Sequence, residues 1–236
     1  MRRLLVAVGI LLVLLVLLDR VGVLFADQAV AKQIRTELAL RQNPSVTIHG
    51  FPFLNQAVAG QYSDVQVRIP SVDSGPLHNL RVDARLKGLR APLDRVVSGN
   101  LSSIPVRDIT GTVSVRYADL AAASGVPGLR IGAAGGGLRV SGQVQLPTGP
   151  VEASAVAAVS VLGNDLVVTA TQAEVDGVEL PPAVLATAAR LLSFRVSARS
   201  LPLALQITGV QIGTDALTVA AKAHDVVLRR GEIPVT

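Results

Sequence analysis

The chain begins with an unbroken apolar run, after which apolar and polar residues alternate for most of its length. Residues 4–18 contain no charge and follow Arg2 and Arg3. This run is near the upper limit for a signal-peptide core and is short for a bilayer span of about 20 residues. If Asp19 and Arg20 are tolerated, the apolar character resumes and lengthens the span to 23 residues. The segment is therefore either a signal peptide or a signal anchor.

The expected cleavage pattern separates these two interpretations. A cut after Ala26 would place Leu24 where signal peptidase requires a small residue. An uncleaved signal anchor over residues 1–26 is therefore favoured over a cleaved signal peptide. In both cases the N-terminal arginines stay in the cytoplasm, so residues 27–236 are expected in the cell envelope, on the extracytoplasmic side of the cell membrane.

Residues 27–41 have the periodicity of an amphipathic helix. Apolar residues recur at every fourth position, as at Ile34 and Leu38, and charged residues lie off this stripe. Pro44 is expected to end the helix, because the residue before a proline avoids the helical region. The apolar stripe needs a surface to cover it.

The rest of the chain is predicted to be mostly β-strand, with short helices at 117–124 and 181–192. The clearest pattern is at 80–87, where four apolar residues alternate with four charged ones. Together these elements predict an α+β fold with a large curved antiparallel sheet packed around a helix. A glycine run marks a candidate internal linker near residues 133–137. The other apolar runs lie at 46–48, 65–69, 113–115, 138–146, 151–162, 166–175, 203–212 and 216–228.

Composition limits the chemistry that this chain can perform. It has no Cys, which excludes disulfides, thiolate metal sites and a cysteine-linked lipid anchor. His49, His78 and His224 lie far apart in the sequence. No GxSxG elbow, phosphate-binding loop or metal-ligand spacing is present. We therefore expect no enzyme activity, no metal and no cofactor.

The charge of the chain argues against a nucleic-acid partner, and its low aromatic content indicates an aliphatic core. The formal net charge is +5 at pH 7, and no basic stretch is interleaved with aromatic residues, so nucleic acid is not an expected partner. Half of the residues are hydrophobic but only 3% are aromatic. The core must consist of Val, Leu, Ile and Ala, which favours strands where Val dominates.

The segment 50–56 differs from its surroundings. It reads Gly-Phe-Pro-Phe-Leu-Asn-Gln and contains Phe51 and Phe53, two of the four Phe in the chain. By composition alone, a bulged strand end that fills the core is the favoured interpretation. The alternative is an apolar lip or floor of a ligand cavity that faces the helix at 27–41.

With its neighbours, this segment resembles the LmeA-type family of actinobacterial envelope proteins. The motif HGFPFLNQ at 49–56 is followed by Gly-Gln-Tyr at 60–62 and Val-Gln-Val at 65–67. The resemblance extends over residues 27 to about 228. It implies a tubular lipid-binding type of fold and a phospholipid ligand, phosphatidylinositol in the mycobacterial member, with a role in lipomannan elongation. The family brings no catalytic residues.

A lipid-binding role agrees with a chain that is rich in apolar strands and poor in reactive groups. Exposing an acyl chain to water costs about 0.8 kcal/mol per CH₂, so such a protein needs apolar walls that shield the chain. A few cations near the opening would hold an anionic headgroup. The candidate residues that contact acyl chains are Ile34, Leu38, Phe51, Phe53 and Leu54. The candidate residues that contact headgroups or the membrane surface are Arg68, Arg81, Arg85, Lys87 and Arg90.

The sequence therefore predicts an exported or membrane-anchored phospholipid-binding protein of the cell envelope. It would shield acyl chains between helix and sheet and support lipoglycan maturation. The alternative is a non-catalytic scaffolding protein of the envelope, whose partner is a glycosyltransferase or a wall polymer. A continuous apolar cavity would favour the first hypothesis, and a solid core would favour the second.

Overall fold

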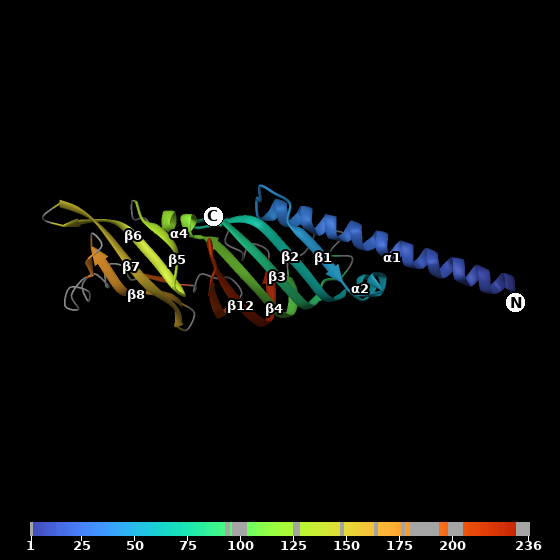
Figure 1. The fold of residues 1–236 in the computed structure, drawn as a ribbon. Coiled ribbons are helices and arrows are strands. Elements are labelled where there is room, and N and C mark those ends of the chain that lie inside the picture. The colour runs from blue at the N-terminus through green and yellow to red at the C-terminus, as the bar shows by residue number, and fades with distance from the viewer. Residues whose placement is uncertain are drawn as a thin grey trace. The chain divides into compact units, whose positions relative to one another are not determined.

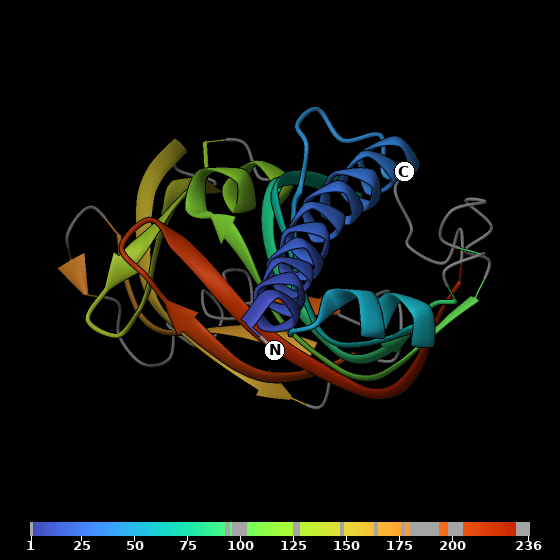
Figure 2. The same cartoon turned by 90° about the vertical axis from the view of Figure 1, so that its right-hand side faces the viewer.

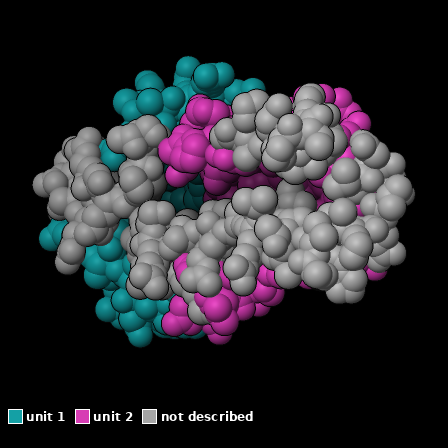
Figure 3. All heavy atoms as spheres, turned by 90° about the vertical axis from the view of Figure 1, so that its left-hand side faces the viewer, with its two compact units in different colours: residues 1–70, 83–110, 223–234 teal, residues 71–82, 111–222, 235–236 magenta. Residues whose placement is uncertain are grey.

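The computed structural model describes residues 2–92, 95, 103–124, 128–146, 149–162, 165–175, 178–179, 194–197 and 205–229. The chain divides into two compact units, coloured in Figure 3. Unit 1 comprises residues 1–70, 83–110 and 223–234, and unit 2 comprises residues 71–82, 111–222 and 235–236. Four long strands contribute residues to both units, and each unit is described below by itself.

Unit 1 begins with one continuous helix, α1 (Arg2–Glu37), whose N-terminal part extends beyond the other elements of the unit (Figure 1). The membrane segment and the helix predicted at 27–41 are thus parts of a single helix. This helix ends at Glu37, earlier than predicted. Ala39 adopts a left-handed conformation with φ 46°, and the Leu40 N–H donates to the Arg35 carbonyl at 2.9 Å. This hydrogen bond is typical of a Schellman motif, so the chain leaves the helix before Pro44 can end it.

After α1, the chain forms β1 (Ser45–His49), α2 (Phe53–Ala59) and the start of β2 (Gln61–Ser74). β1 pairs antiparallel with β2, with Val46 opposite Val67. The segment 50–56 was expected as a strand end or a cavity lip, but its second half is the first turn of α2. Gly60 ends this helix with φ 62°, and a Cβ there would lie 2.8 Å from the Cα of Pro92, so only glycine fits.

The larger part of the sheet follows from alternation. β3 (Leu77–Arg90) and β4 (Ser103–Arg116) continue from β2, and β12 (Ala216–Arg229) and β11 (Gln206–Ile212) complete a six-stranded sheet. The strand order is β1-β2-β3-β4-β12-β11. The predicted alternation at 80–87 is confirmed, with Leu80 and Leu86 buried and the basic residues exposed. The predicted α+β class with an N-terminal apolar helix and a large antiparallel sheet is also confirmed.

Unit 2 contains a second sheet and the short helix α4 (Tyr117–Ala123), which was predicted. The hairpin of β7 and β8 was predicted as well, and Leu162 pairs with Asp165 at its end. The glycine run considered as a linker forms the turn between β5 and β6, where Gly135 and Gly136 have φ 53° and 84°. The helix predicted at 181–192 lies outside the described residues. The strands are β5 (Arg130–Ala134), β6 (Gly137–Leu146), β7 (Gly149–Leu162), β8 (Asp165–Val175), β9 (Val178–Glu179) and β10 (Phe194–Ser197), in the order β10-β8-β7-β6-β5 with β9 paired to β8.

Each unit has its own aliphatic core. In unit 1, Val106 is 1% exposed, and Phe53 and Tyr62 supply the aromatic part of the core. In unit 2, Leu138 and Ala157 are fully buried. Among the described residues, further aliphatic side chains pack against the core of unit 2 but stay partly exposed: Val72, Leu77, Val113, Leu129, Ile131, Val159, Ile207, Val210, Ile212 and Val219.

Candidate functional site

The junction between α1 and α2 is formed by one turn of α1. The Asp19 carboxylate is only 2% exposed, and its Oδ1 accepts a hydrogen bond of 2.8 Å from the backbone N–H of Leu54. Leu54 lies in the first turn of α2, whose N–H groups have no partner within the helix, so Asp19 caps α2 from another helix. Gly22 leaves room for the Phe53 ring, which lies 3.5 Å from where a Cβ would stand. Figure 2 shows α1 and α2 next to each other.

A second contact joins α1 to β1. Asp27 Oδ1 accepts a hydrogen bond of 3.0 Å from the Ile48 N–H. The apolar stripe of α1 continues past this contact, and its side chains at Val30, Ile34 and Leu38 are only half-buried. The stripe is therefore incompletely covered by the residues that the structure describes.

The three candidate residues of the 50–56 segment have different environments. Phe53 is 5% exposed, and its ring centroid lies 6.4 Å from that of Tyr62. Phe51 is 58% exposed, and the guanidinium of Arg20 lies 5.0 Å from the centre of its ring. Leu54 is 37% exposed. Phe53 thus belongs to the core, as the structural interpretation held, while Phe51 and Leu54 are surface residues. Burial raises the pKa of Tyr62.

Phe51 borders a pocket of about 560 Å³ in unit 1. This volume is within the range of small-molecule sites. Among the described residues that line it, Arg107 from β4 is the one cation, and α2 and β2 contribute polar groups. An adjacent pocket of about 340 Å³ shares Gln61, Gly88 and Arg107, and adds Arg90. The lining of the larger pocket is Gly50, Phe51, Pro52, Asn55, Gln56, Gln61, Tyr62, Ser63, Gly88 and Arg107.

Arg107 was not predicted from the sequence. Its Nε donates to Asp108 Oδ2 at 3.0 Å, and no partner of its terminal nitrogens is found among the described residues. Asp108 also contacts Nδ1 of His224 at 2.7 Å. The hydrogen bond from Arg107, followed by that from His224, lowers the pKa of Asp108. The guanidinium therefore lies next to a carboxylate, and Arg107 lines both pockets.

The predicted headgroup cations differ in how far they are neutralised. Arg68 pairs with Asp83 at 3.0 Å, and Arg85 pairs with Asp64 at 2.9 Å. The hydrogen bond from Gln66 and then the contact with Arg68 lower the pKa of Asp83. These two arginines form cross-strand ion pairs between β2 and β3. Because a carboxylate already neutralises each of them, they are poorer candidates for binding an anionic headgroup.

The remaining three cations are exposed. Arg81 and Lys87 have no partner among the described residues, and Arg90 borders the smaller pocket. Arg90 is exposed three residues after the exposed Lys87, and Gly88 between them has φ 65°. Of the five predicted cations, only Arg90 lines a pocket that the structure describes.

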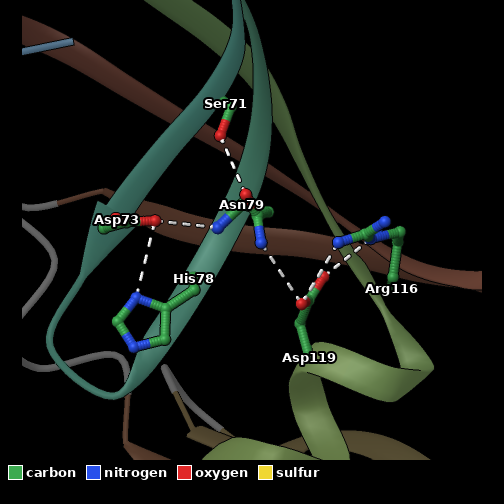
Figure 4. A network of polar contacts seen from close by, with 6 residues as sticks. All are labelled: Ser71, Asp73, His78, Asn79, Arg116 and Asp119. Atoms are coloured by element: carbon green, nitrogen blue, oxygen red, sulfur yellow. Dashed lines mark hydrogen bonds and ion pairs between the residues drawn. The ribbon is translucent and has the colours of Figure 1, made fainter. Parts of the chain in front are cut away.

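A polar network in unit 2 contains His78 together with Ser71, Asp73, Asn79, Arg116 and Asp119 (Figure 4). Asp119 accepts hydrogen bonds from Arg116 at 2.7 Å and from the Asn79 side chain at 3.4 Å. The bond from Arg116 is the main reason that the pKa of Asp119 is lowered. Asp73 accepts from the Asn79 N–H at 2.9 Å and lies 3.5 Å from His78. The network therefore joins the β2–β3 turn to the start of α4.

Two further observations concern metals and membranes. Within the described residues, no group of three or more His, Asp and Glu side chains could hold a metal ion. Among the same residues, α1 is the one helix that is long and apolar enough to cross a membrane. Its apolar side chains from Ile10 to Leu18 are between 43% and 60% exposed.

Neither the curated proteins nor the solved structures contain a match to this chain. A family model described as LmeA-like phospholipid-binding matches residues 17–222, which begin within α1 just before Asp19. This match covers most of the chain and confirms the resemblance found in the sequence. The chain therefore belongs to the LmeA-like phospholipid-binding family.

Proposed function

We propose that this protein is held in the cell membrane by an uncleaved α1 and binds one anionic phospholipid on the extracytoplasmic side. It acts without catalysis by shielding the acyl chains from water. Its ligand would be phosphatidylinositol or a related lipid, and its role would be to support lipoglycan maturation. The family assignment supports phospholipid binding itself.

The incompletely covered stripe of α1 is the observation that carries this proposal. Ile34 and Leu38 remain half-buried although α1 is in contact with β1. Leaving such aliphatic surface in water is unfavourable by about 25 cal/mol per Å². An acyl chain lying along this stripe would cover it, and the protein would in turn cover the acyl chain.

The pockets beside the motif at 49–56 support a position for the headgroup. The terminal nitrogens of Arg107 have no partner among the described residues. Arg107 borders both pockets, and Arg90 borders the smaller one. A guanidinium can bind two phosphate oxygens at once, which favours arginine at such a position. The phosphate would therefore be held by Arg107, with Arg90 as a second cation. Arg81 and Lys87 would contact the membrane surface.

The competing function is a scaffold in the envelope whose core is solid and whose partner is a protein or a polymer. The packed core of unit 2, with Leu138 and Ala157 fully buried, is the observation that favours it. A scaffolding role does not explain why the apolar stripe of α1 is incompletely covered by the described residues. We therefore favour lipid binding over scaffolding.

Binding of a phospholipid with a fluorescent acyl chain to the full chain in detergent micelles tests the proposal. Ile34→Asn would place an amide against the acyl chain, at a cost of about 1–3 kcal/mol, so affinity should fall about fivefold or more. Thr36→Asn, on an exposed position two residues later, is the matched control and should bind as the wild type does. Equal affinity of all three proteins would contradict a lipid site on this face of α1.

A further inference from the structure

The short helix α2 has an apolar face that does not contribute to the core. Phe53 and Ala57 form its buried side. Leu54 and Val58 each come one residue after this buried pair. They are four residues apart and therefore lie on one side of the helix, next to the buried side. Leu54 is 37% exposed and Val58 is 83% exposed, and Phe51 just before the helix is 58% exposed. Leu54 and Val58 thus expose one apolar side of α2, and Phe51 adds a third exposed apolar side chain just before the helix; we call these three residues the α2 face.

The α2 face lies beside the part of α1 where the long apolar run ends. Asp19 binds the backbone N–H of Leu54 at 2.8 Å, and Arg20 lies over the ring of Phe51 at 5.0 Å. Both residues follow Leu18, the last residue of the run, which is 60% exposed. With a rise of 1.5 Å per residue, Leu18 and Gly22 are only about 6 Å apart along the helix axis. The exposed apolar surface of α1 therefore continues onto the α2 face.

We propose that Phe51, Leu54 and Val58 insert into the interfacial layer of the same bilayer that α1 crosses. The occupant of this face is a lipid surface, because a helix whose side chains lie in the hydrocarbon core brings the adjoining α2 face to the level of the headgroups. Aromatic residues favour this level, and an arginine there can extend its charge to the lipid phosphates. The proposal rests on the anchoring role of α1 and adds a second, reversible contact with the membrane.

Asp19 is the positioning residue of this device. An acidic residue directly after an apolar membrane segment is costly unless it has a partner. Here the carboxylate is 2% exposed and is bound to α2, so it fixes the angle between the anchor and the α2 face instead of contacting lipid. The family domain also includes this residue, since it begins at residue 17. Cleavage after Ala26 would remove Asp19 and Arg20 and with them the junction, so the device requires a retained α1.

Tryptophan fluorescence tests the proposal directly, because the chain has no Trp. Val58→Trp places the only tryptophan, which can be excited selectively over the two tyrosines, on the α2 face of the full chain, reconstituted in phosphatidylcholine vesicles that contain brominated acyl chains. The control is Thr36→Trp, an exposed position near the C-terminal end of α1, about 24 Å along the axis of α1 from Arg20. We expect a blue-shifted emission and loss of most of the fluorescence for Val58→Trp, and neither effect for Thr36→Trp.

The outcomes separate this proposal from the proposed function. Failure of the protein to sediment with the vesicles would contradict the anchoring role itself. Sedimentation without quenching at Val58→Trp would leave the anchor intact and overturn docking of the α2 face. The tryptophan of Val58→Trp could also be protected from aqueous quenchers and yet not be quenched by brominated lipid. This result would overturn docking on the membrane, because a protein partner or a second copy would then cover the α2 face.

A second variant tests the role of Asp19. In the Val58→Trp protein, Asp19→Ala removes the acceptor of the Leu54 N–H, and part of the quenching by brominated lipid should be lost. Asp27→Ala removes the comparable hydrogen bond to β1 at Ile48 and is the control that should keep full quenching. Equal quenching with and without Asp19 would refute its positioning role.

Discussion

Phe51 and Phe53 lie in different environments, so replacing each with alanine should have different effects on stability. Phe53 is 5% exposed and packs near Tyr62, whereas Phe51 is 58% exposed. Truncating a packed Phe costs about 3–5 kcal/mol of unfolding free energy. Truncating Phe51 removes mainly its interaction with Arg20, worth about 0.5–1 kcal/mol at an exposed site. The two variants should therefore differ by about 2 kcal/mol or more.

The two tyrosines of the chain provide the assay. Tyr62 lies in unit 1 and Tyr117 in unit 2, so in a Tyr117→Phe background the remaining fluorescence reports on unit 1. The full chain in detergent micelles is titrated with guanidinium chloride, and the unfolding free energies of Phe51→Ala and Phe53→Ala are compared with that of the background protein. Equal losses in the two variants, or a loss below about 1 kcal/mol for Phe53→Ala, would refute this reasoning.

Three further predictions concern unit 2. Leu138→Ala should lower the unfolding free energy by about 2–5 kcal/mol, because this side chain is fully buried, and thermal unfolding followed by circular dichroism measures the loss. Tyr117→Phe should cost about 0.5–1.5 kcal/mol, because the hydroxyl donates to the Gly213 carbonyl at 2.7 Å, and chemical denaturation of unit 2 measures it. Arg116 lowers the pKa of Asp119, so the stability from this pair is complete above the unfolded pKa of about 3.9 and is lost as the pH falls through the folded pKa. The melting temperature of the wild type should therefore fall more steeply in this range than that of Asp119→Asn, and parallel curves would contradict the prediction.

The elements with a repeating pattern could be predicted from the sequence. The alternation at 80–87 is maintained by one buried face and one charged face of β3, and α4 and the β7–β8 hairpin have local turn and helix signals. These signals depend on neighbouring residues, and for this reason they predict structure without knowledge of the fold. The end of α1 was predicted too late, because a left-handed Ala39 has no clear signal in the sequence.

The elements that depend on distant contacts could not be predicted. α2 has only seven residues and no side-chain cap of its own, and its capping carboxylate comes from Asp19, 35 residues before Leu54. In the sequence, Asp19 is only a charge at the end of an apolar run. Arg107 reaches the pocket because β4 lies beside Gly88 of β3, and no local pattern indicates that pairing.

For the candidate site, the sequence indicated which segments border the described pocket or remain half-buried, but it did not indicate the environment of each side chain. The motif at 49–56 borders the larger pocket, and the α1 stripe with Ile34 and Leu38 is half-buried. Strand alternation placed Arg85 on the charged face, but it could not show that Asp64 neutralises it. Pairing between strands decides which cations stay free, and this pairing is a property of the fold.

Native mass spectrometry of the purified full chain tests the central claim, phospholipid binding, most directly. The protein is released from detergent micelles in the spectrometer, and the mass of any molecule that remains bound is measured and identified by fragmentation. The account predicts one bound phospholipid per chain with an anionic headgroup, and a lower occupancy in Ile34→Asn than in Thr36→Asn. Folded protein that carries no phospholipid, or equal occupancy in both variants, would contradict it.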